Sequence, residues 1–149
     1  MTDDPTEADT PSPRLRPLGR LAMLMRQSAL IRGTPAGDRV IIEFSDIRWT
    51  GERLNAVQRG AAADWLSVGP EGTAVLDIRF CLETAEGALI YVQGGGRTNS
   101  ATFAQGSPIY FAPTFETNHP LYAWLNQVQA VAKGVVQSGG VVFKVAEVV

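Results

Sequence analysis

Asp77 and Arg79 are two residues apart in the segment Leu76-Asp77-Ile78-Arg79, so their side chains share one face of an extended strand. If that face lines the interior of a barrel, a carboxylate and a guanidinium lie together in a region of low dielectric constant. Arg79 could then hold an oxyanion while Asp77 orients it or accepts a proton. The structural alternative is a salt bridge on the outer face, or a buried pair that fixes the register of the strands.

Asp64 is a second candidate for proton transfer because it precedes Trp65. Burial beside a large apolar ring raises the pKa of a carboxyl group towards the range that is useful in catalysis. Neighbouring residues of a strand point to opposite faces, however, so only one of these two side chains can point inward. In the structural alternative, Asp64 caps the turn that follows Gly60 to Ala63.

A third group of candidates surrounds Phe115-Glu116-Thr117. Glu116 is a candidate acid or base, and Tyr122, Trp124 and Asn126 follow it closely. Carboxylate, phenol, indole and amide groups together suit the recognition of an oxygenated aromatic or polyketide-like molecule. The alternative is a folded loop that these side chains hold together by hydrogen bonds.

Two further residues are candidates for contacts with a ligand. Arg53 follows Gly51-Glu52 and could contact an anion, although a solvated pair of charges in a turn is the ordinary interpretation. Tyr91 lies in an apolar segment and could contribute a phenol to the same ligand.

Three other features favour structural interpretations. His119 has no Gly-x-Ser-x-Gly elbow to accompany it, and Asn118-His119-Pro120 is typical of the entry to a helical turn. Cys81 shares a face with Asp77 and Arg79, but an apolar packed thiol fits it better than a nucleophile. The run from Gly94 to Gly96 lacks the spacing of a phosphate-binding loop and is expected to be a flexible strand exit.

The elements that must position these residues are short strands separated by turns. Residues 74–84 alternate apolar and polar residues, Thr84-Ala85-Glu86-Gly87 supplies a turn, and residues 88–93 form a second strand, which together predict a hairpin. Residues 18–30 fit either a helix or a strand, and we favour a strand. The remaining predicted strands are 39–44, 47–50, 64–68, 109–115, 127–133 and 141–149, with helical turns at 100–105 and 120–125.

This succession predicts an all-β fold. No helix is long enough to alternate with the strands, so a doubly wound sheet is disfavoured. A closed or nearly closed antiparallel β-barrel of about eight to ten strands is expected over residues 14–149 as a single domain, with one or two short helical turns. A barrel of this size can hold one small ligand.

Composition excludes several classes of protein. The 149 residues include one Cys and one His, so an internal disulfide is impossible and a Cys/His metal centre is disfavoured. Residues 1–13 carry four acids and no base, and are expected to be a disordered tail. The rest has eleven acids and thirteen scattered bases, too few for a nucleic-acid binder. Without a long apolar run or a signal peptide, the chain is expected to be cytoplasmic and not to bind membranes.

Several short segments occur together in a recognisable order. The succession resembles the bacterial and fungal family catalogued as domain of unknown function 3237, over residues from about 15 to the C-terminus. The resemblance implies a compact β-barrel of about this length and implies no general activity. The segments that carry it are Gly33-Thr34-Pro35-Ala36-Gly37-Asp38-Arg39, Gly51-Glu52-Arg53-Leu54, Ala63-Asp64-Trp65, Leu76-Asp77-Ile78-Arg79, Glu86-Gly87-Ala88-Leu89-Ile90-Tyr91, Phe115-Glu116-Thr117 and Tyr122-Ala123-Trp124-Leu125-Asn126.

The chain also departs from the pattern of this family. Ser45-Asp46 stands where the family usually has a pair of glycines, and the lead into Asp64-Trp65 is Gly60-Ala61-Ala62-Ala63. Loss of backbone freedom at these turns could reshape the mouth of the barrel.

The functional hypothesis follows by elimination. No nucleotide fingerprint, metal-ligand set or nucleophile elbow is present in the sequence, whereas carboxylates, arginines and tyrosines lie near apolar segments. We therefore predict a cofactor-independent isomerase, lyase or cyclase that moves protons on a small, largely apolar, oxygen-bearing metabolite. The alternatives are a non-catalytic protein that binds the same kind of molecule, and an oligomeric assembly module in which the lumen is plugged by bulky side chains.

Overall fold

The computed structural model describes residues 10–149. Within them the chain forms nine antiparallel strands and two short 3₁₀-helices. The strands are β1 (Leu15–Thr34), β2 (Gly37–Thr50), β3 (Ala56–Gln58), β4 (Ala63–Val68), β5 (Thr73–Thr84), β6 (Leu89–Asn99), β7 (Ile109–Glu116), β8 (Ala130–Gln137) and β9 (Gly140–Val148), and the helices are η2 (Phe103–Gln105) and η3 (Pro120–Gln127).

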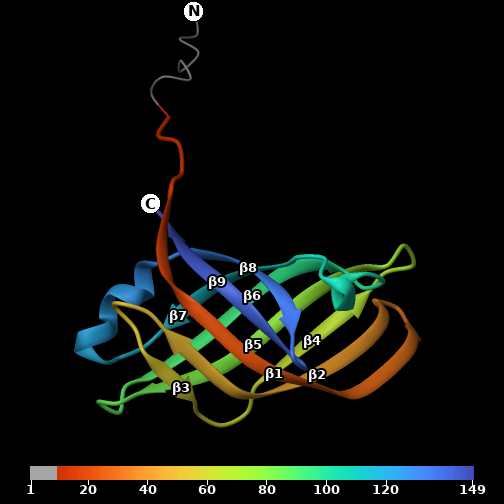
Figure 1. Ribbon diagram of the computed structural model, residues 1–149, viewed down its shortest axis with the longest axis horizontal. Coiled ribbons are helices and arrows are strands. Elements are labelled where there is room, and N and C mark those ends of the chain that lie inside the picture. Colours follow the sequence, from red (N-terminus) through yellow and green to blue (C-terminus); the bar gives the residue numbers. More distant parts are fainter. Residues whose placement is uncertain (1–9) are drawn as a thin grey trace, which may run out of the picture.

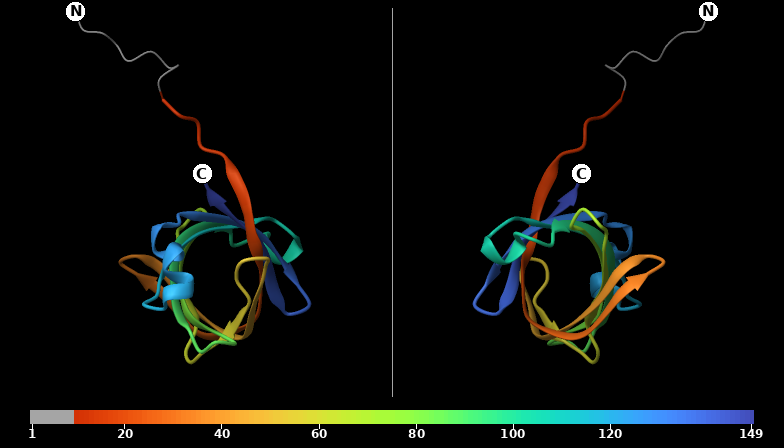
Figure 2. Two further views of the ribbon diagram at one scale, coloured as in Figure 1. Left: turned by 90° about the vertical axis from the view of Figure 1, so that its left-hand side faces the viewer. Right: turned by 90° about the vertical axis from the view of Figure 1, so that its right-hand side faces the viewer.

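Eight of these strands close into a ring, which confirms the predicted barrel. The order around the ring is β1-β9-β8-β7-β6-β5-β4-β2, and β2 pairs again with β1. The ninth strand, β3, lies between β2 and β5 beyond the end of β4. Figure 2 shows the ring from either end, and Figure 1 shows η3 and η2 at opposite ends of its long axis. We call these the η3 end and the η2 end.

The predicted hairpin of residues 74–84 and 88–93 is confirmed as β5 and β6. Ala74 pairs with Thr98 and Glu83 with Leu89, so the two strands stay in register along their whole length. The strand β6 continues through Gly94–Gly96, where we expected a flexible exit, and that prediction is wrong. A Cβ atom at Gly96 would collide with the carbonyl oxygen of Tyr110 on β7, so glycine lets two strands of the curved wall approach closely.

Other elements differ from the predictions in their bounds. Residues 18–30 are indeed a strand, but β1 runs from Leu15 to Thr34. The segments 39–44 and 47–50 are one strand, β2, which bends where Asp46 adopts a left-handed backbone conformation with φ of 52°. Asp46 adopts this conformation without glycine, because aspartate tolerates this region better than most residues. Strand β3 was not predicted, and β8 begins three residues later than expected.

The two helical turns occur close to where they were expected. η2 is shorter than the predicted 100–105, and Thr102, the residue before it, makes no side-chain cap. η3 begins at Pro120 as predicted and extends to Gln127. The expectation of a disordered tail at 1–13 falls mainly on residues outside those that the structure describes.

The middle of the barrel is filled with side chains rather than open. Alternate residues of each strand point inward, as the pattern of β5 predicted, and the largest of them meet in one core. Phe111 and Phe143 approach with ring centroids 5.8 Å apart, and Trp49 meets Phe115 edge to face at 5.7 Å. Space for a ligand inside the wall is therefore confined to the ends of the barrel.

Candidate functional site

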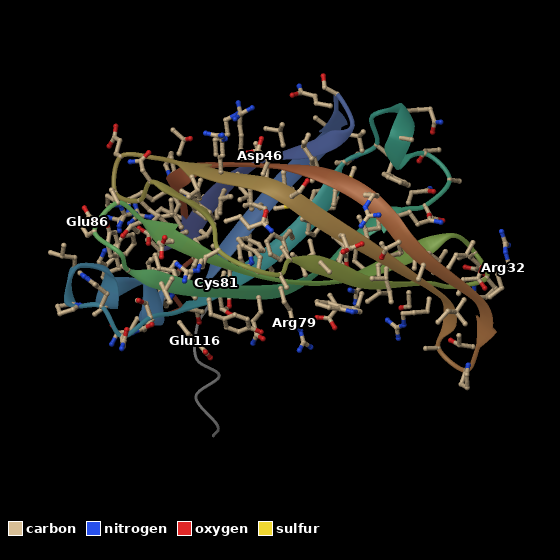
Figure 3. The ribbon with its side chains drawn as sticks, turned by 90° about the horizontal axis from the view of Figure 1, so that it is seen from below. Arg32, Asp46, Arg79, Cys81, Glu86 and Glu116 are labelled. Atoms are coloured by element: carbon tan, nitrogen blue, oxygen red, sulfur yellow. The ribbon has the colours of Figure 1, made fainter. Side chains whose placement is uncertain are left out.

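The predicted pair Asp77 and Arg79 lies on the outer face of β5. The side chains retain 47% and 52% of their solvent exposure, and the Arg79 guanidinium donates to the Asp77 carboxylate over 3.2 and 3.3 Å. Figure 3 shows Arg79 projecting away from the wall of the barrel. The expectation that these two residues face the lumen is wrong, because Leu76, Ile78 and Phe80 occupy the inward positions of β5.

The candidates near Glu116 also lie outside the lumen. Glu116 is exposed at the end of β7 and projects outward (Figure 3). It pairs across the sheet with Tyr91, whose hydroxyl donates to Gln93 on the outer face at 2.9 Å. Neither side chain therefore contributes to a site inside the barrel.

The loop of η3 follows the structural alternative. The amide of Asn126 both accepts from the Thr117 N–H and donates to the Thr117 carbonyl at 2.9 Å, which ties the loop before η3 to the last turn of the helix. His119 Nδ1 accepts from the Leu121 N–H and caps η3. Tyr122 donates to Glu86 at 2.8 Å, a hydrogen bond that lowers the pKa of Glu86 and raises that of Tyr122.

Arg53 and Trp124 come together, but around a carboxylate of the protein itself. The guanidinium of Arg53 stacks 4.5 Å from the centre of the Trp124 ring and donates to Glu147 at 2.8 Å. Arg16 binds the same carboxylate oxygen. We call Arg16, Arg53, Trp124 and Glu147 the Glu147 cluster, and it lies at the η3 end.

The Glu147 carboxylate is buried and fully compensated. It is only 4% exposed, and this burial raises its pKa, but the hydrogen bonds and charges of Arg16 and Arg53 outweigh the burial and leave the pKa below its ordinary value. The anion contact predicted for Arg53 is thus occupied by Glu147. The sequence carries a signal for this residue, because Glu147 is in phase with the inward-pointing Val141, Phe143 and Val145 of β9.

Asp64 is the predicted residue that the structure buries inside the barrel. Asp64 is 4% exposed and points inward from β4, whereas Trp65 points outward and is 38% exposed. Neighbouring residues of a strand point to opposite faces, so only one of these two side chains can point inward, and it is that of Asp64. Trp65 cannot serve as the apolar wall beside Asp64, so that part of the prediction is wrong.

A break in the sheet holds the Asp64 carboxyl in place. The ladder between β4 and β5 has the pairs Asp64–Ile78 and Ser67–Val75 but none between them. In this gap Asp64 Oδ1 accepts the backbone N–H of Asp77 at 2.9 Å, and Arg39 donates to the Trp65 carbonyl at 2.7 Å. The carboxyl group thus takes the place of a backbone acceptor in the ladder, which fixes its orientation.

The environment of Asp64 shifts its proton affinity strongly. Burial raises the pKa of Asp64 from 3.8 to about 6, the hydrogen bond from the Asp77 N–H opposes that rise, and the Asp77 charge adds to it. Within residues 10–149, no Lys, Arg or His forms an ion pair with Asp64. A buried carboxyl without a cation is the arrangement that enzymes use for a general acid or base near neutral pH.

Asp64 faces a cavity of about 210 Å³ at the η2 end. We call it the Asp64 cavity. Its walls are mainly aliphatic, Phe103 of η2 covers one side, and three other polar residues contribute to the lining. The lining residues are Gln27, Val40, Ile42, Asp64, Leu66, Val68, Ala74, Leu76, Thr98, Ser100, Phe103 and Ile109. Of these, Asp64 is the titratable residue that sequence reasoning found, whereas Thr98 and Ser100 were missed as site residues.

The comparisons with known proteins agree with this architecture. The model of the family described as "Protein of unknown function (DUF3237)" matches residues 13–148. The chain belongs to this family. This outcome confirms the resemblance seen in the sequence.

Relatives extend the same picture. A UPF0311 protein of Rhodopseudomonas palustris (strain ATCC BAA-98 / CGA009) is 30% identical over 124 residues, which cover 75% of this chain and 81% of the relative. A β-barrel-like protein of Acinetobacter baumannii AYE superposes with a TM-score of 0.82 at 27% identity, over 96% of this chain and all of the other. A structure described as an enzyme from Penicillium herquei superposes with a TM-score of 0.68 at 18% identity, over 95% and 98% of the two chains. At that identity the last likeness shows the fold alone.

Two further properties concern the part of the chain that the structure describes. No group of three or more His, Cys, Asp and Glu side chains converges there in a way that could hold a metal ion. Neither of the helices in residues 10–149 has the length and apolar character needed to cross a membrane.

Proposed function

We propose that this protein is a proton-transfer enzyme in which Asp64 exchanges a proton with a small, uncharged, largely apolar molecule bound in the Asp64 cavity. The observation that carries the proposal is the buried carboxyl group, with a pKa near 6, that faces an apolar cavity without a cationic partner. A group with this pKa is ionised in a useful fraction at neutral pH and can also return the proton that it takes.

The proposed reaction has two steps. The Asp64 carboxylate takes a proton from an activated O–H or C–H bond of the bound molecule. The released electron pair forms a new bond in that molecule, and the electron pair of a neighbouring bond moves to another of its atoms. The resulting carboxylic acid then returns the proton to a different atom, which regenerates the carboxylate. Isomerase, lyase and cyclase reactions all fit this sequence, and acid–base chemistry of this kind needs no cofactor.

Two considerations support an enzyme over a passive fold. A buried carboxyl group without a cation costs the folded state free energy, and proteins keep such groups mainly where they act on a ligand. The protein of Penicillium herquei that shares this fold is described as an enzyme.

The test compares the small molecules that copurify with the wild-type protein and with Asp64→Asn. An enzyme stalled at its first step should retain its substrate, so the variant should carry a compound that differs from the wild-type compound in mass or chromatographic retention. Mass spectrometry coupled to chromatography measures this directly. The same compound in equal amount in both proteins would overturn the proposal.

The same compound in equal amount in both proteins would instead support a non-catalytic protein that binds the same kind of molecule. The small volume and aliphatic lining of the cavity favour this candidate as much as they favour the enzyme. A role as an assembly module would require the outer wall to bind other chains, and that alternative predicts no retained compound in either protein.

A further inference from the structure

The hydroxyl groups at the outer part of the Asp64 cavity are committed as donors. Thr98 donates to the Pro108 carbonyl at 3.1 Å, and Ser100 donates to the Gly72 carbonyl at 2.8 Å. A carbonyl oxygen can only accept, so each hydroxyl has spent its single hydrogen on the protein. What remains to either side chain is a lone pair, which recognises a hydrogen-bond donor. Both residues are half-buried, so they lie nearer to solvent than Asp64 does.

The inner part of the cavity also presents a hydrogen-bond acceptor. Asp64 Oδ1 already accepts from the Asp77 N–H, and an ionised carboxylate has no hydrogen to donate. The lining includes no Lys, Arg or His, and Gln27 is an exposed residue. An anionic ligand would therefore meet no cation and would face the Asp64 carboxylate, whereas a neutral ligand with O–H groups would satisfy acceptors at both ends.

The strand register places these two ends apart. Asp64 pairs with Ile78 of β5, and Thr98 pairs with Ala74 of the same strand, so the two residues differ by four positions along β5 and lie on the strands that flank it. Four positions of a strand span about 13 Å, and two strand spacings add about 10 Å across the sheet. A ligand that contacts both ends must therefore be elongated.

The volume is consistent with such a ligand. An apolar cavity of about 150 Å³ holds one benzene molecule, so about 210 Å³ encloses roughly one and a half rings. The outer part of the ligand would then lie at the mouth, beside Thr98 and Ser100. The aliphatic walls between the two polar ends would contact its middle.

We propose that the Asp64 cavity takes an uncharged, elongated molecule that is apolar in its middle and carries a hydroxyl group at each end. This inference rests on the proposed function in taking the Asp64 cavity as the site. It adds that the inner hydroxyl binds to Asp64 and that the outer hydroxyl binds to Thr98 and Ser100.

The first test uses three probes built on naphthalene at pH 7.5: 2,6-dihydroxynaphthalene, 2,6-dimethylnaphthalene and 2-naphthoate. The methyl groups replace the hydroxyls at nearly constant size, and the naphthoate adds a negative charge. We expect the diol to bind at least fivefold more tightly than the dimethyl compound despite its lower hydrophobicity, because unpaired buried acceptors penalise the latter. We expect no binding of the naphthoate. Ligand-observed NMR and fluorescence titration measure these affinities.

The second test assigns the outer hydroxyl. Thr98→Val should weaken the binding of the diol about fivefold without weakening that of 2,6-dimethylnaphthalene, and Ser100→Ala should act in the same direction. Thr114→Val is the matched control, because the Thr114 hydroxyl also donates to a backbone carbonyl but lies on the outer wall. This control should change neither affinity.

Three results would overturn the inference: equal affinity for the diol and the dimethyl compound, binding of the naphthoate as tight as that of the diol, or no binding of any probe. These results are separate from a failure of the proposed function. Preferred binding of the diol, together with one and the same copurified compound in the wild type and in Asp64→Asn, would leave the ligand class standing and remove the enzyme. Different copurified compounds in the wild type and in Asp64→Asn, without preference for the diol, would support the enzyme and remove the ligand class.

Discussion

A carboxyl group is buried at each end of the barrel, and the two groups are held in opposite ways. Glu147 at the η3 end receives two arginine side chains, whereas Asp64 at the η2 end receives one backbone N–H and faces the cavity. Each is 4% exposed, yet the pKa of Glu147 lies below its ordinary value and that of Asp64 rises to about 6. Burial without a cation thus marks Asp64 as a candidate catalytic group, whereas its two arginine partners make Glu147 a structural clamp.

The largest effect should come from the chemistry of the η2 end. 5-Nitrobenzisoxazole reports on any carboxylate base in an apolar cavity: the base takes the C–H proton, the N–O bond breaks, and a cyanophenolate absorbs visible light. We expect Asp64→Asn to lower the rate about 10³-fold. The wild-type rate should rise with pH through about 6 and then level off, because the ionised carboxylate is the base.

Glu116→Gln is the control for this reaction, since it neutralises an exposed carboxylate of the outer wall. A control rate equal to that of the wild type is expected. Equal rates for Asp64→Asn and the wild type would show that the cavity does not activate its carboxyl group.

The second effect concerns the clamp at the η3 end. Replacing Arg16 and Arg53 together by Gln should leave Glu147 buried without a cation and destabilise the protein by about 3 kcal/mol at pH 8. The loss should shrink at pH 4.5, because Glu147 then takes up a proton when its partners are gone. Urea denaturation at the two pH values measures the difference, and an equal loss at both would contradict the account of Glu147.

The third effect is the dependence of stability on pH at Asp64. Because the pKa is raised from 3.8 to about 6, the folded protein holds the proton more tightly than the unfolded chain between those values. The contribution of Asp64 to the free energy of unfolding should therefore fall as pH rises from about 4 to 6 and stay low above that. The shift corresponds to about 3 kcal/mol. Asp64→Asn should lack this fall and be more stable than the wild type at pH 8.

The smallest effect is expected for the exposed pair on the outer face of β5. Arg79→Gln should leave the free energy of unfolding nearly unchanged, since both charges are well solvated. It should also leave the reaction of 5-nitrobenzisoxazole within about twofold of the wild type. A loss of reactivity comparable to that of Asp64→Asn would restore the first functional hypothesis for Asp77 and Arg79.

The sequence predicted the barrel because alternation and turn residues act locally. The period of two in residues 74–84 identified β5 and its inward face, and Gly87 marked the turn to β6. The same pattern already placed Leu76 and Ile78 on the apolar face, so Asp77 and Arg79 had to point outward. Their polar character attracted a functional interpretation that the alternation of the strand did not support.

Other parts of the site depend on contacts between distant segments. The cavity exists because β1, β2, β4, β5, β6, β7 and η2 leave space at one end, which no local pattern encodes. Arg53 meets Glu147 across 94 residues, and at the break in the ladder beside Asp64 the Trp65 carbonyl accepts from Arg39 of another strand. Only the phase of Asp64 with Leu66, and of Glu147 with Val145, could have indicated their burial in advance.

The pairing of β1 with β9 has a consequence for how the chain folds. Arg16 and Glu147 are 131 residues apart in sequence, yet they lie side by side where the ring closes. During synthesis the wall can assemble hairpin by hairpin but must remain open until β9 has left the ribosome, with the edge of β1 unpaired until then. We expect closure to be the slow step of folding, and shortening the chain before β9 should yield an aggregating product rather than a smaller barrel.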